Sequence, residues 1–364
     1  MGYDSRSIQT ITSEQAPSLI AAYIHACANC QYTIKPGDLL SENTLSGYTQ
    51  AAALWLRFTV PHLRTFSIGD PTNPSKLHPM VADTLAMRHK WREPKAKRQP
   101  YTEPMYLELH KRVMAAIKQH PSNMFTREAC VYDWTRLGIF TGSRGVEYVQ
   151  TTGNHTKWEA VPNNPCAGIW AGKPLAFIYS DFTLLQNSRV LTRKELLQPD
   201  CMPDSLQVRF RFDKSPTNFS IRKYKRTGHH IFCPVSAAHN IIRRAALLKV
   251  GEYEPLAHFI QNKKRSPYKG KTILLLSDDI IEVMRLMCRT VYPEDHIMHK
   301  LAHKVDCHSN RITAAVALAN AGLTVDEIAF RLRWKPASVE HYLRDCYNQI
   351  GKYCNSTIAG AQLI

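Results

Sequence analysis

The chain has 364 residues, of which 44% are hydrophobic and 9% aromatic, too much apolar material for a disordered or fibrous chain. At about 150 residues per domain, this length predicts two or three domains. Lysine and arginine outnumber aspartate and glutamate by 47 to 30, a net charge of +17. Such an excess suits a polyanionic partner, nucleic acid first, although charge alone also fits a protein that is simply basic.

The sequence has no feature of a secreted or membrane-anchored protein. No apolar run approaches the roughly 20 residues of a membrane helix, and the first residues lack the pattern of a signal peptide. Position 6 is Arg6, where a myristoylation motif requires Ser or Thr. We therefore expect no membrane partner and no secretion, with a location in the nucleus if the source is eukaryotic and otherwise in the cytoplasm.

The ten cysteines are spread from Cys27 to Cys354 without a dense framework, which predicts reduced thiols rather than disulfides. Cys27 and Cys30 form a CxxC pair beside His25, but no second pair lies at the spacing of a zinc finger. Small core residues are the simpler interpretation, and we expect no metal site.

A basic, proline-containing segment divides the chain. It reads RHKWREPKAKRQPYTEP over residues 88–104, which predicts an extended linker lying against phosphates, although a solvated linker or a nuclear-import signal also fits. Its basic residues are Arg88, Lys90, Arg92, Lys95, Lys97 and Arg98. We expect a helical domain over 1–88, the linker over 89–103, a second domain over 104–350 and a tail over 351–364.

In chain order, the first domain is expected to hold a helix capped by Ser13 that runs to Cys30, and a second over 42–58. The second domain begins with a helix capped by Thr102, with Pro104 in its first turn. The next helix starts at Thr126 and stops at Gly142, where a left-handed residue is easily accommodated.

The pattern then changes to a period of two over 206–212, which predicts a half-buried strand followed by a hairpin turn at 215–218 and a return strand over 219–233. Later segments favour helices that start at Pro234 and Ser277, and one over 309–321. Thr324 and Glu327 form a capping box, and Pro336 opens the last helix. The fold class is mainly α with a small antiparallel β-sheet (α+β).

Five polar and aromatic residues stand in a characteristic order: Arg144 in TGSRGVEY, His308 and Arg311 in HSNR, then Trp334 and Tyr342. Together these motifs resemble the tyrosine recombinase (phage integrase) family. The resemblance implies a helical domain that clamps DNA, followed by a catalytic domain in which Arg144, Lys214, His308, Arg311 and Trp334 surround a DNA phosphate and Tyr342 is the nucleophile. LRWKPASVEHYLR is similar to the branch found in eukaryotic mobile elements.

The residue types suit this chemistry. Two guanidiniums can bind the non-bridging phosphate oxygens and stabilise the charge of a pentacoordinate phosphorane. His308 and Arg311 are three residues apart at a helix start, so they share one face beside free N–H groups. Tyr342 needs a nearby base, such as His308, to act as a nucleophile.

Two residues keep alternative interpretations. Lys214 lies at the predicted hairpin and could protonate the leaving 5′ oxygen, but Lys223 and Lys225 lie on the same hairpin and either could replace it; we also expect these two to bind DNA. Glu147 matches an acidic family position and would orient Arg144, or it is a helix-surface glutamate.

The HxxR spacing occurs three times, at His89, His308 and His341, and only His308 precedes an alanine-rich helix at a suitable distance from a tyrosine. The long gap from Arg144 to His308 predicts an insertion over 151–204. Trp334 replaces the histidine that is commoner in the family, and is expected to pack and to donate a hydrogen bond through its indole N–H.

The resemblance implies a site-specific DNA recombinase or integrase that cleaves and rejoins double-stranded DNA through a 3′-phosphotyrosyl intermediate. It implies a homotetramer on two DNA sites that needs neither metal, ATP nor another cofactor. The alternative is a non-catalytic DNA-binding protein, either a helix-turn-helix regulator or a domesticated recombinase. That alternative leaves Arg144 and the hairpin lysine without a role.

Overall fold

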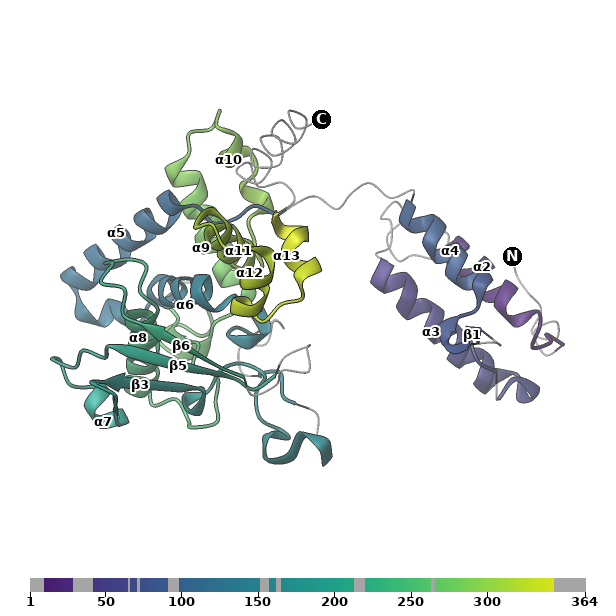
Figure 1. Cartoon of the computed structure of the whole chain (residues 1–364), viewed down its shortest axis with the longest axis horizontal. Helices are drawn as coiled ribbons and strands as arrows, with labels where there is room; N and C mark the ends of the chain where they lie inside the picture. Colours follow the sequence, from purple (N-terminus) through teal and green to yellow (C-terminus); the bar gives the residue numbers. More distant parts are fainter. Residues whose placement is uncertain are drawn as a thin grey trace, which may run out of the picture. The chain divides into compact units, whose positions relative to one another are not determined.

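The computed structural model describes residues 10–28, 42–64, 66–70, 73–90, 98–150, 157–161, 165–212, 220–262 and 266–343. The chain forms two compact units, Met1–Lys95 and Ala96–Ile364 (Figure 1). Over these described stretches, no helix is both long enough and apolar enough to cross a membrane. The cysteines that the structure describes are free thiols; Cys30 lies outside them.

In its described residues, the N-terminal unit contains the helices α2 (Ala16–Ala28), α3 (Glu42–Thr59) and α4 (Pro79–Lys90), and a hairpin of β1 (Gly69–Asp70) and β2 (Asn73–Leu77). The start of α2 differs from the prediction, because Thr12 rather than Ser13 supplies the side-chain oxygen, which accepts from the Gln15 N–H at 3.3 Å. The helix α4 continues to Lys90, two residues into the segment predicted as linker.

In the C-terminal unit, the buried helix α6 (Arg127–Thr141) packs against α5 (Glu103–Gln119). The Thr126 hydroxyl accepts from the Ala129 N–H, and Gly142 ends α6 at a φ of 57°, so both predicted ends of this helix are confirmed. Trp134 of α6 stacks on Tyr148 with ring centroids 5.6 Å apart. This stacking places the segment after Gly142 against the core.

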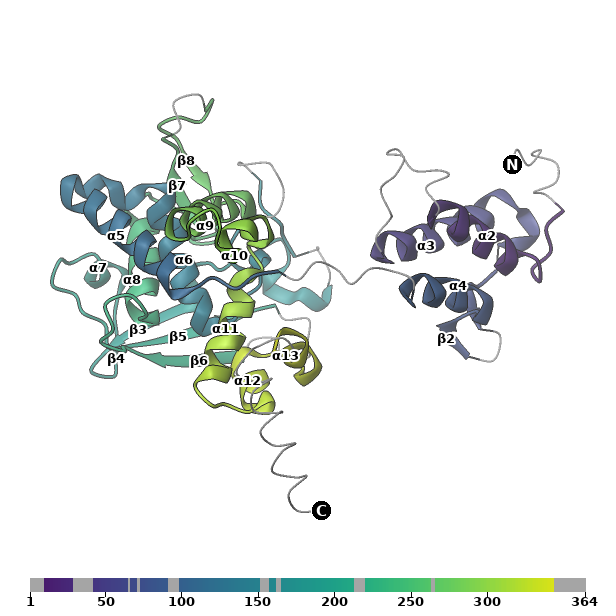
Figure 2. The ribbon, with the colours of Figure 1, turned by 90° about the horizontal axis from the view of Figure 1, so that it is seen from above.

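A four-stranded antiparallel sheet lies beside these helices in the order β4-β3-β5-β6 (Figure 2). Its strands are β3 (Phe182–Gln186), β4 (Arg189–Val190), β5 (Ser205–Phe210) and β6 (Ser220–Lys225). The predicted alternation in β5 is confirmed, because Leu206, Val208 and Phe210 are buried. β6 ends at Lys225, whereas the return strand is predicted to run to residue 233. The strand β3 lies within the predicted insertion over 151–204 and is an inner strand of the sheet.

The helix α8 (Pro234–Leu247) packs on β3, β5 and β6. A second hairpin, β7 (His258–Ile260) with β8 (Thr272–Leu274), leads into α9 (Ser277–Val291) and the short α10 (Ile297–Lys300). The sequence patterns do not predict the β3–β4 and β7–β8 pairs, whereas the starts of α8 and α9 agree with the predictions.

Near the end of the described residues come α11 (Ser309–Asn320), α12 (Val325–Leu332) and α13 (Pro336–Leu343), which lie together in Figure 1. They share a small hydrophobic core of their own that includes Ala314, Ile328 and Val339. The predicted capping box of α12 is confirmed, since the Thr324 hydroxyl accepts from the Glu327 N–H and the Glu327 carboxylate accepts from the Thr324 N–H. The unit is thus mainly α with a small antiparallel sheet, as predicted.

Candidate active site

His308 and Tyr342 meet at the start of α11. The Nε2 of His308 lies 2.5 Å from the Oη of Tyr342, although the two residues belong to different helices. Asp306 fixes the entry to α11, because its carboxylate accepts from the N–H groups of His308 and Ser309 at 2.7 and 3.1 Å. The imidazole is therefore held by a capped helix start, within hydrogen-bond distance of the phenol.

Trp334 lies between α12 and α13, against the same phenol. Its ring is 5.2 Å from that of Tyr342 in an edge-to-face arrangement, and the guanidinium of Arg311 lies 4.0 Å above its ring. The indole Nε1 is buried and donates to none of the described residues, so the expected hydrogen bond is not made within the described chain. Trp334 contributes packing and a cation–π contact here.

Arg311 is almost completely buried, with 6% of its surface exposed. Its Nη1 donates to the carbonyl of Gly142 at 2.8 Å, which connects α11 to the turn that ends α6. Burial lowers the pKa of Arg311, while the neighbouring Tyr342 and Glu147 raise it and Arg144 lowers it.

Arg144 and Glu147 occupy the turn after α6, at the 3-10 helix η3 (Gly145–Glu147). The backbone N–H of Arg144 donates to Oε2 of Glu147 at 2.8 Å, and its Nη1 lies 3.6 Å from Oε1. The side chain of Glu147 is 7% exposed and that of Arg144 25%. Glu147 is therefore a buried partner of Arg144 and not a helix-surface glutamate, whereas the guanidinium of Arg144 keeps access to solvent.

The turn that carries Arg144 is attached to the start of α11 by a second contact. The hydroxyl of Tyr148 lies 3.6 Å from the sulfur of Cys307, and a Cβ on Gly145 would meet that sulfur at 3.2 Å. This close approach explains how residues so far apart in sequence as Arg144 and His308 come to lie in one site. Burial raises the pKa of the Cys307 thiol to about 11, so this cysteine stays protonated and acts in packing.

The sequence patterns missed Arg333, which belongs to the same site. Its side chain is 2% exposed, with Nη2 3.5 Å from Oε2 of Glu147 and the guanidinium carbon 3.2 Å from the centre of the Phe210 ring. A basic residue after an amphipathic helix is ordinarily expected at the surface. Its only local signal is its position directly before Trp334.

The sheet reaches this site through β6, which packs on α12. The Nη2 of Arg222 donates to the carbonyl of Phe330 at 3.2 Å, and the guanidinium of Arg331 lies 4.6 Å from the centre of the Tyr224 ring. Side chains alternate along a strand, so the exposed Lys223 and Lys225 lie on the opposite face of β6 from the buried Tyr224. Lys214, the favoured hairpin lysine, lies outside the described residues.

The structure describes only some of the basic residues of the predicted linker. Arg92, Lys95 and Lys97 lie outside the described residues, and Arg88 and Lys90 fall within α4, with side chains that are not described. Arg98 forms an ion pair with Asp306. Arg98 thus attaches the chain before α5 to the loop that begins α11, and its expected contact with a DNA phosphate stays a prediction.

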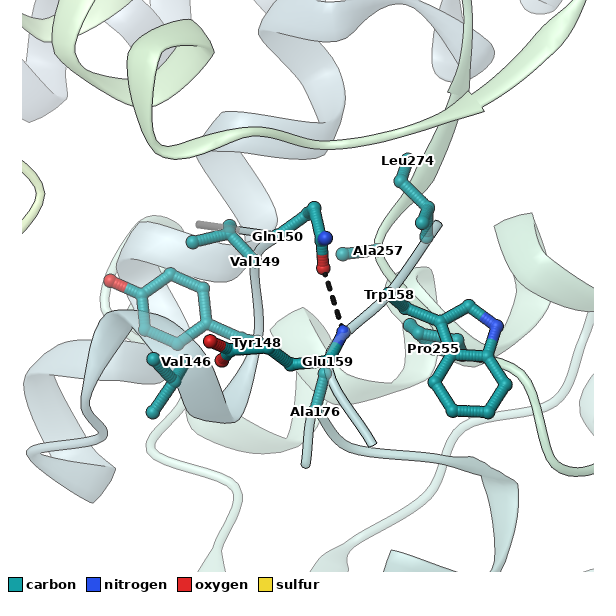
Figure 3. A pocket seen from close by; sticks show the side chains of 10 residues that line it. All are labelled: Val146, Tyr148, Val149, Gln150, Trp158, Glu159, Ala176, Pro255, Ala257 and Leu274. Carbon is teal, nitrogen blue, oxygen red and sulfur yellow. Dashed lines mark hydrogen bonds between the residues drawn. The ribbon is translucent and has the colours of Figure 1, made fainter. Parts of the chain in front are cut away.

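The segment that carries Tyr148 and Gln150 also borders a pocket (Figure 3). Its lining includes Tyr148, Gln150, Trp158 and Glu159, and the side-chain oxygen of Gln150 accepts from the backbone N–H of Glu159 at 3.2 Å. None of the residues predicted for catalysis lines this pocket. We therefore place the candidate site at Tyr342 and its neighbours, not in the pocket.

No protein-family model matches the chain, and no curated protein matches it. Among solved structures it is similar to the integrase of the transposon Tn1549 in complex with transposon right-end DNA. The two are 13% identical, with a TM-score of 0.44 over 96% of this chain and 86% of the integrase chain.

Proposed function

We propose that the chain is a tyrosine recombinase that breaks and rejoins DNA strands through a covalent 3′-phosphotyrosyl intermediate. The observation that carries this proposal is the 2.5 Å contact between Nε2 of His308 and Oη of Tyr342, next to a buried arginine. A phenol, a base within hydrogen-bond reach and a fixed positive charge are what phosphoryl transfer to tyrosine requires.

Arg144 and Arg311 would hold the phosphate. Arg311 has one N–H group on the Gly142 carbonyl and the Trp334 ring beneath it, so its orientation is fixed before DNA arrives. Arg144 is a quarter exposed and can turn its guanidinium toward a bound strand. The two cations would stabilise the extra charge that builds on the non-bridging oxygens in the transition state.

The proposed step forms one bond and breaks one. The Oη of Tyr342 attacks the phosphorus, its proton passes to Nε2 of His308, and the bond to the 5′ oxygen breaks. The leaving oxygen takes a proton from a lysine, for which we retain Lys214, with Lys223 and Lys225 as alternatives. The energy of the broken phosphodiester bond is kept in the new bond to the tyrosine oxygen, so rejoining needs no external energy source.

The proposed substrate is double-stranded DNA, in keeping with the net charge of +17 and the exposed lysines of β6. Exchange between two DNA sites implies four active subunits, and we propose a homotetramer. Light scattering on the complex with a two-site DNA would report this state directly, and a complex that holds a single chain at saturation would exclude it.

Covalent trapping tests the proposal. The protein is incubated with nicked duplexes from the DNA that flanks its gene, denatured, and examined for a protein–DNA adduct. We expect an adduct that Tyr342→Phe abolishes. Tyr292→Phe is the matched control, because that hydroxyl bonds to Thr102 outside the site and its loss should leave the adduct intact.

Two other outcomes are informative. An adduct that survives in Tyr342→Phe would move the nucleophile to another residue, Tyr347 being the next candidate. Tight binding of the correct DNA without any adduct would favour a non-catalytic DNA-binding protein, for which α11, α12 and α13 would serve as a helix-turn-helix.

A further inference from the structure

Arg333 occupies a backbone conformation that does not suit an arginine. It has a φ of 60° and a ψ of 40° at the end of α12, the left-handed region in which a Cβ approaches the following carbonyl and glycine is favoured. The conformation turns the chain from α12 toward Trp334. Glycine would perform that turn at lower cost, so the presence of arginine calls for a reason in its side chain.

That side chain is buried, and burying a guanidinium is unfavourable unless an opposite charge accompanies it. The carboxylate of Glu147 lies 3.5 Å from Nη2 and supplies the opposite charge, and the face of the Phe210 ring adds a cation–π contact. Neither partner faces solvent, since Phe210 is 1% and Glu147 6% exposed. The interaction with Glu147 is therefore only weakly screened.

Glu147 is shared between two arginines. Its Oε2 accepts from the backbone N–H of Arg144 and lies near Nη2 of Arg333, while its Oε1 lies 3.6 Å from Nη1 of Arg144. A lone carboxylate beside Arg144 would offset the positive charge that a phosphate needs there. A second arginine removes that conflict, because it offsets the carboxylate and leaves its hydrogen bond to the turn in place.

We propose that Arg333 is a positioning residue: it neutralises Glu147, so that Glu147 can orient Arg144 without offsetting the positive charge with which Arg144 stabilises the phosphate in the transition state. This inference rests on the proposed function and adds a specific electrostatic role to a residue outside the motif set. Arg333 acts through Glu147 and Arg144 and does not touch the reacting atoms.

The test compares Arg333→Gly, Glu147→Gln and the double variant with the wild-type chain, in both adduct formation and DNA affinity. Glycine is chosen because it suits the backbone, so a loss cannot come from strain at this turn. We expect Arg333→Gly to slow adduct formation about ten- to a hundredfold in the DNA-saturated complex, with the dissociation constant for nicked duplex changed less than about twofold. The double variant should recover about tenfold over Arg333→Gly, because the carboxylate that needed neutralising is gone.

Recovery in the double variant separates this role from the others. If Arg333 only filled space, or bound the phosphate directly, Glu147→Gln would restore nothing, and a double variant as slow as Arg333→Gly overturns the inference. Arg333→Lys keeps the charge and should retain more activity than Arg333→Gly.

Thermal unfolding tests whether Arg333 neutralises Glu147 without depending on catalysis. The double variant should unfold at a higher temperature than Arg333→Gly, because it no longer buries a carboxylate that has lost one of its arginine partners. If the wild-type chain forms no adduct, the proposed function fails, and unfolding alone decides whether Arg333 neutralises Glu147; equal unfolding temperatures for the two variants would then refute the neutralisation as well.

Discussion

The imidazole of His308 contacts the hydroxyl of Tyr342 at 2.5 Å across two helices that are separated by α12 in the sequence. As a positioned base, such a group contributes about 10²- to 10⁴-fold to a proton transfer. We therefore expect His308→Ala to slow adduct formation by that factor. His303→Ala is the control, since this exposed side chain contacts only the carbonyl of Lys300 among the described residues. Equal rates in the two variants would remove His308 from the mechanism.

Both the backbone angle and the close packing favour glycine at position 142, whereas at Gly172 only the backbone angle does. Both have a positive φ, 57° and 73°, so alanine at either position carries a backbone cost of about 1–2 kcal/mol. A Cβ at Gly142 would also lie 2.9 Å from Cδ2 of Leu332 and 3.1 Å from Cζ2 of Trp334, while nothing lies within 4 Å at Gly172. Gly142→Ala should therefore lose about 1–3 kcal/mol more stability than Gly172→Ala in urea unfolding. Equal losses would show that Trp334 and Leu332 accommodate the methyl group.

Asp133 is a buried carboxylate that serves two buried arginines. Its oxygens bond to Nη2 of Arg136 at 2.6 Å and to Nη2 of Arg244. Removing it leaves two buried positive charges uncompensated, so Asp133→Ala should lower the free energy of unfolding by about 3–5 kcal/mol. The exposed Asp200 offers the comparison, and Asp200→Ala should change stability by less than about 0.5 kcal/mol. Urea midpoints measure both, and a small effect at Asp133 would mean that the arginines reach solvent when unpaired.

Three histidines of the C-terminal unit make its stability depend on pH. Burial lowers the pKa of His239 and of His258, and of His110, where His230 and Arg136 act in the same direction. In the unfolded chain these histidines bind protons near a pKa of about 6.5. Their contribution to the free energy of unfolding is therefore fully present above that pH and is lost as the pH falls below it. The unfolding temperature should decline between about pH 6.5 and 5.

His239→Gln tests this dependence at one site. The Nε2 of His239 donates to the carbonyl of Leu196 at 2.8 Å, a bond that the glutamine amide can also supply. The variant should therefore show a flatter decline over the same pH range. A decline as steep as that of the wild-type chain would exclude His239 as a contributor.

Local signals in the sequence predict much of this fold. Thr126, Gly142, Pro234 and Thr324 mark helix ends through the backbone groups that they satisfy or the φ angles that they accept, and the structure has helix ends there. The order of the site motifs also predicts which side chains meet at Tyr342. The helix ends are predicted from residues close together in the chain, and the set of site residues from the resemblance to a family.

The rest depends on contacts that no local pattern contains. The strands of the β3–β4 and β7–β8 pairs are short, so alternation has little length over which to appear. Arg333 follows an amphipathic helix as a surface arginine would, and only the arrival of Glu147 and Phe210 from distant segments buries it. The exchange of a Ser13 cap for Thr12 is different, because Thr12 and Gln15 bond to each other reciprocally in a local capping-box pattern.

The helices α11, α12 and α13 have a hydrophobic core in which half of the buried residues are alanines. An alanine buries little apolar surface, so these three helices gain less from packing than the helices around Trp134. Their opening should therefore require less free energy than unfolding of the whole unit, and amide hydrogens of α12 and α13 should exchange before those of α6. Tyr342 lies on α13, within this more easily opened segment. Substitutions in the small core of α11, α12 and α13, away from the reacting atoms, should therefore change the lifetime of its contact with His308.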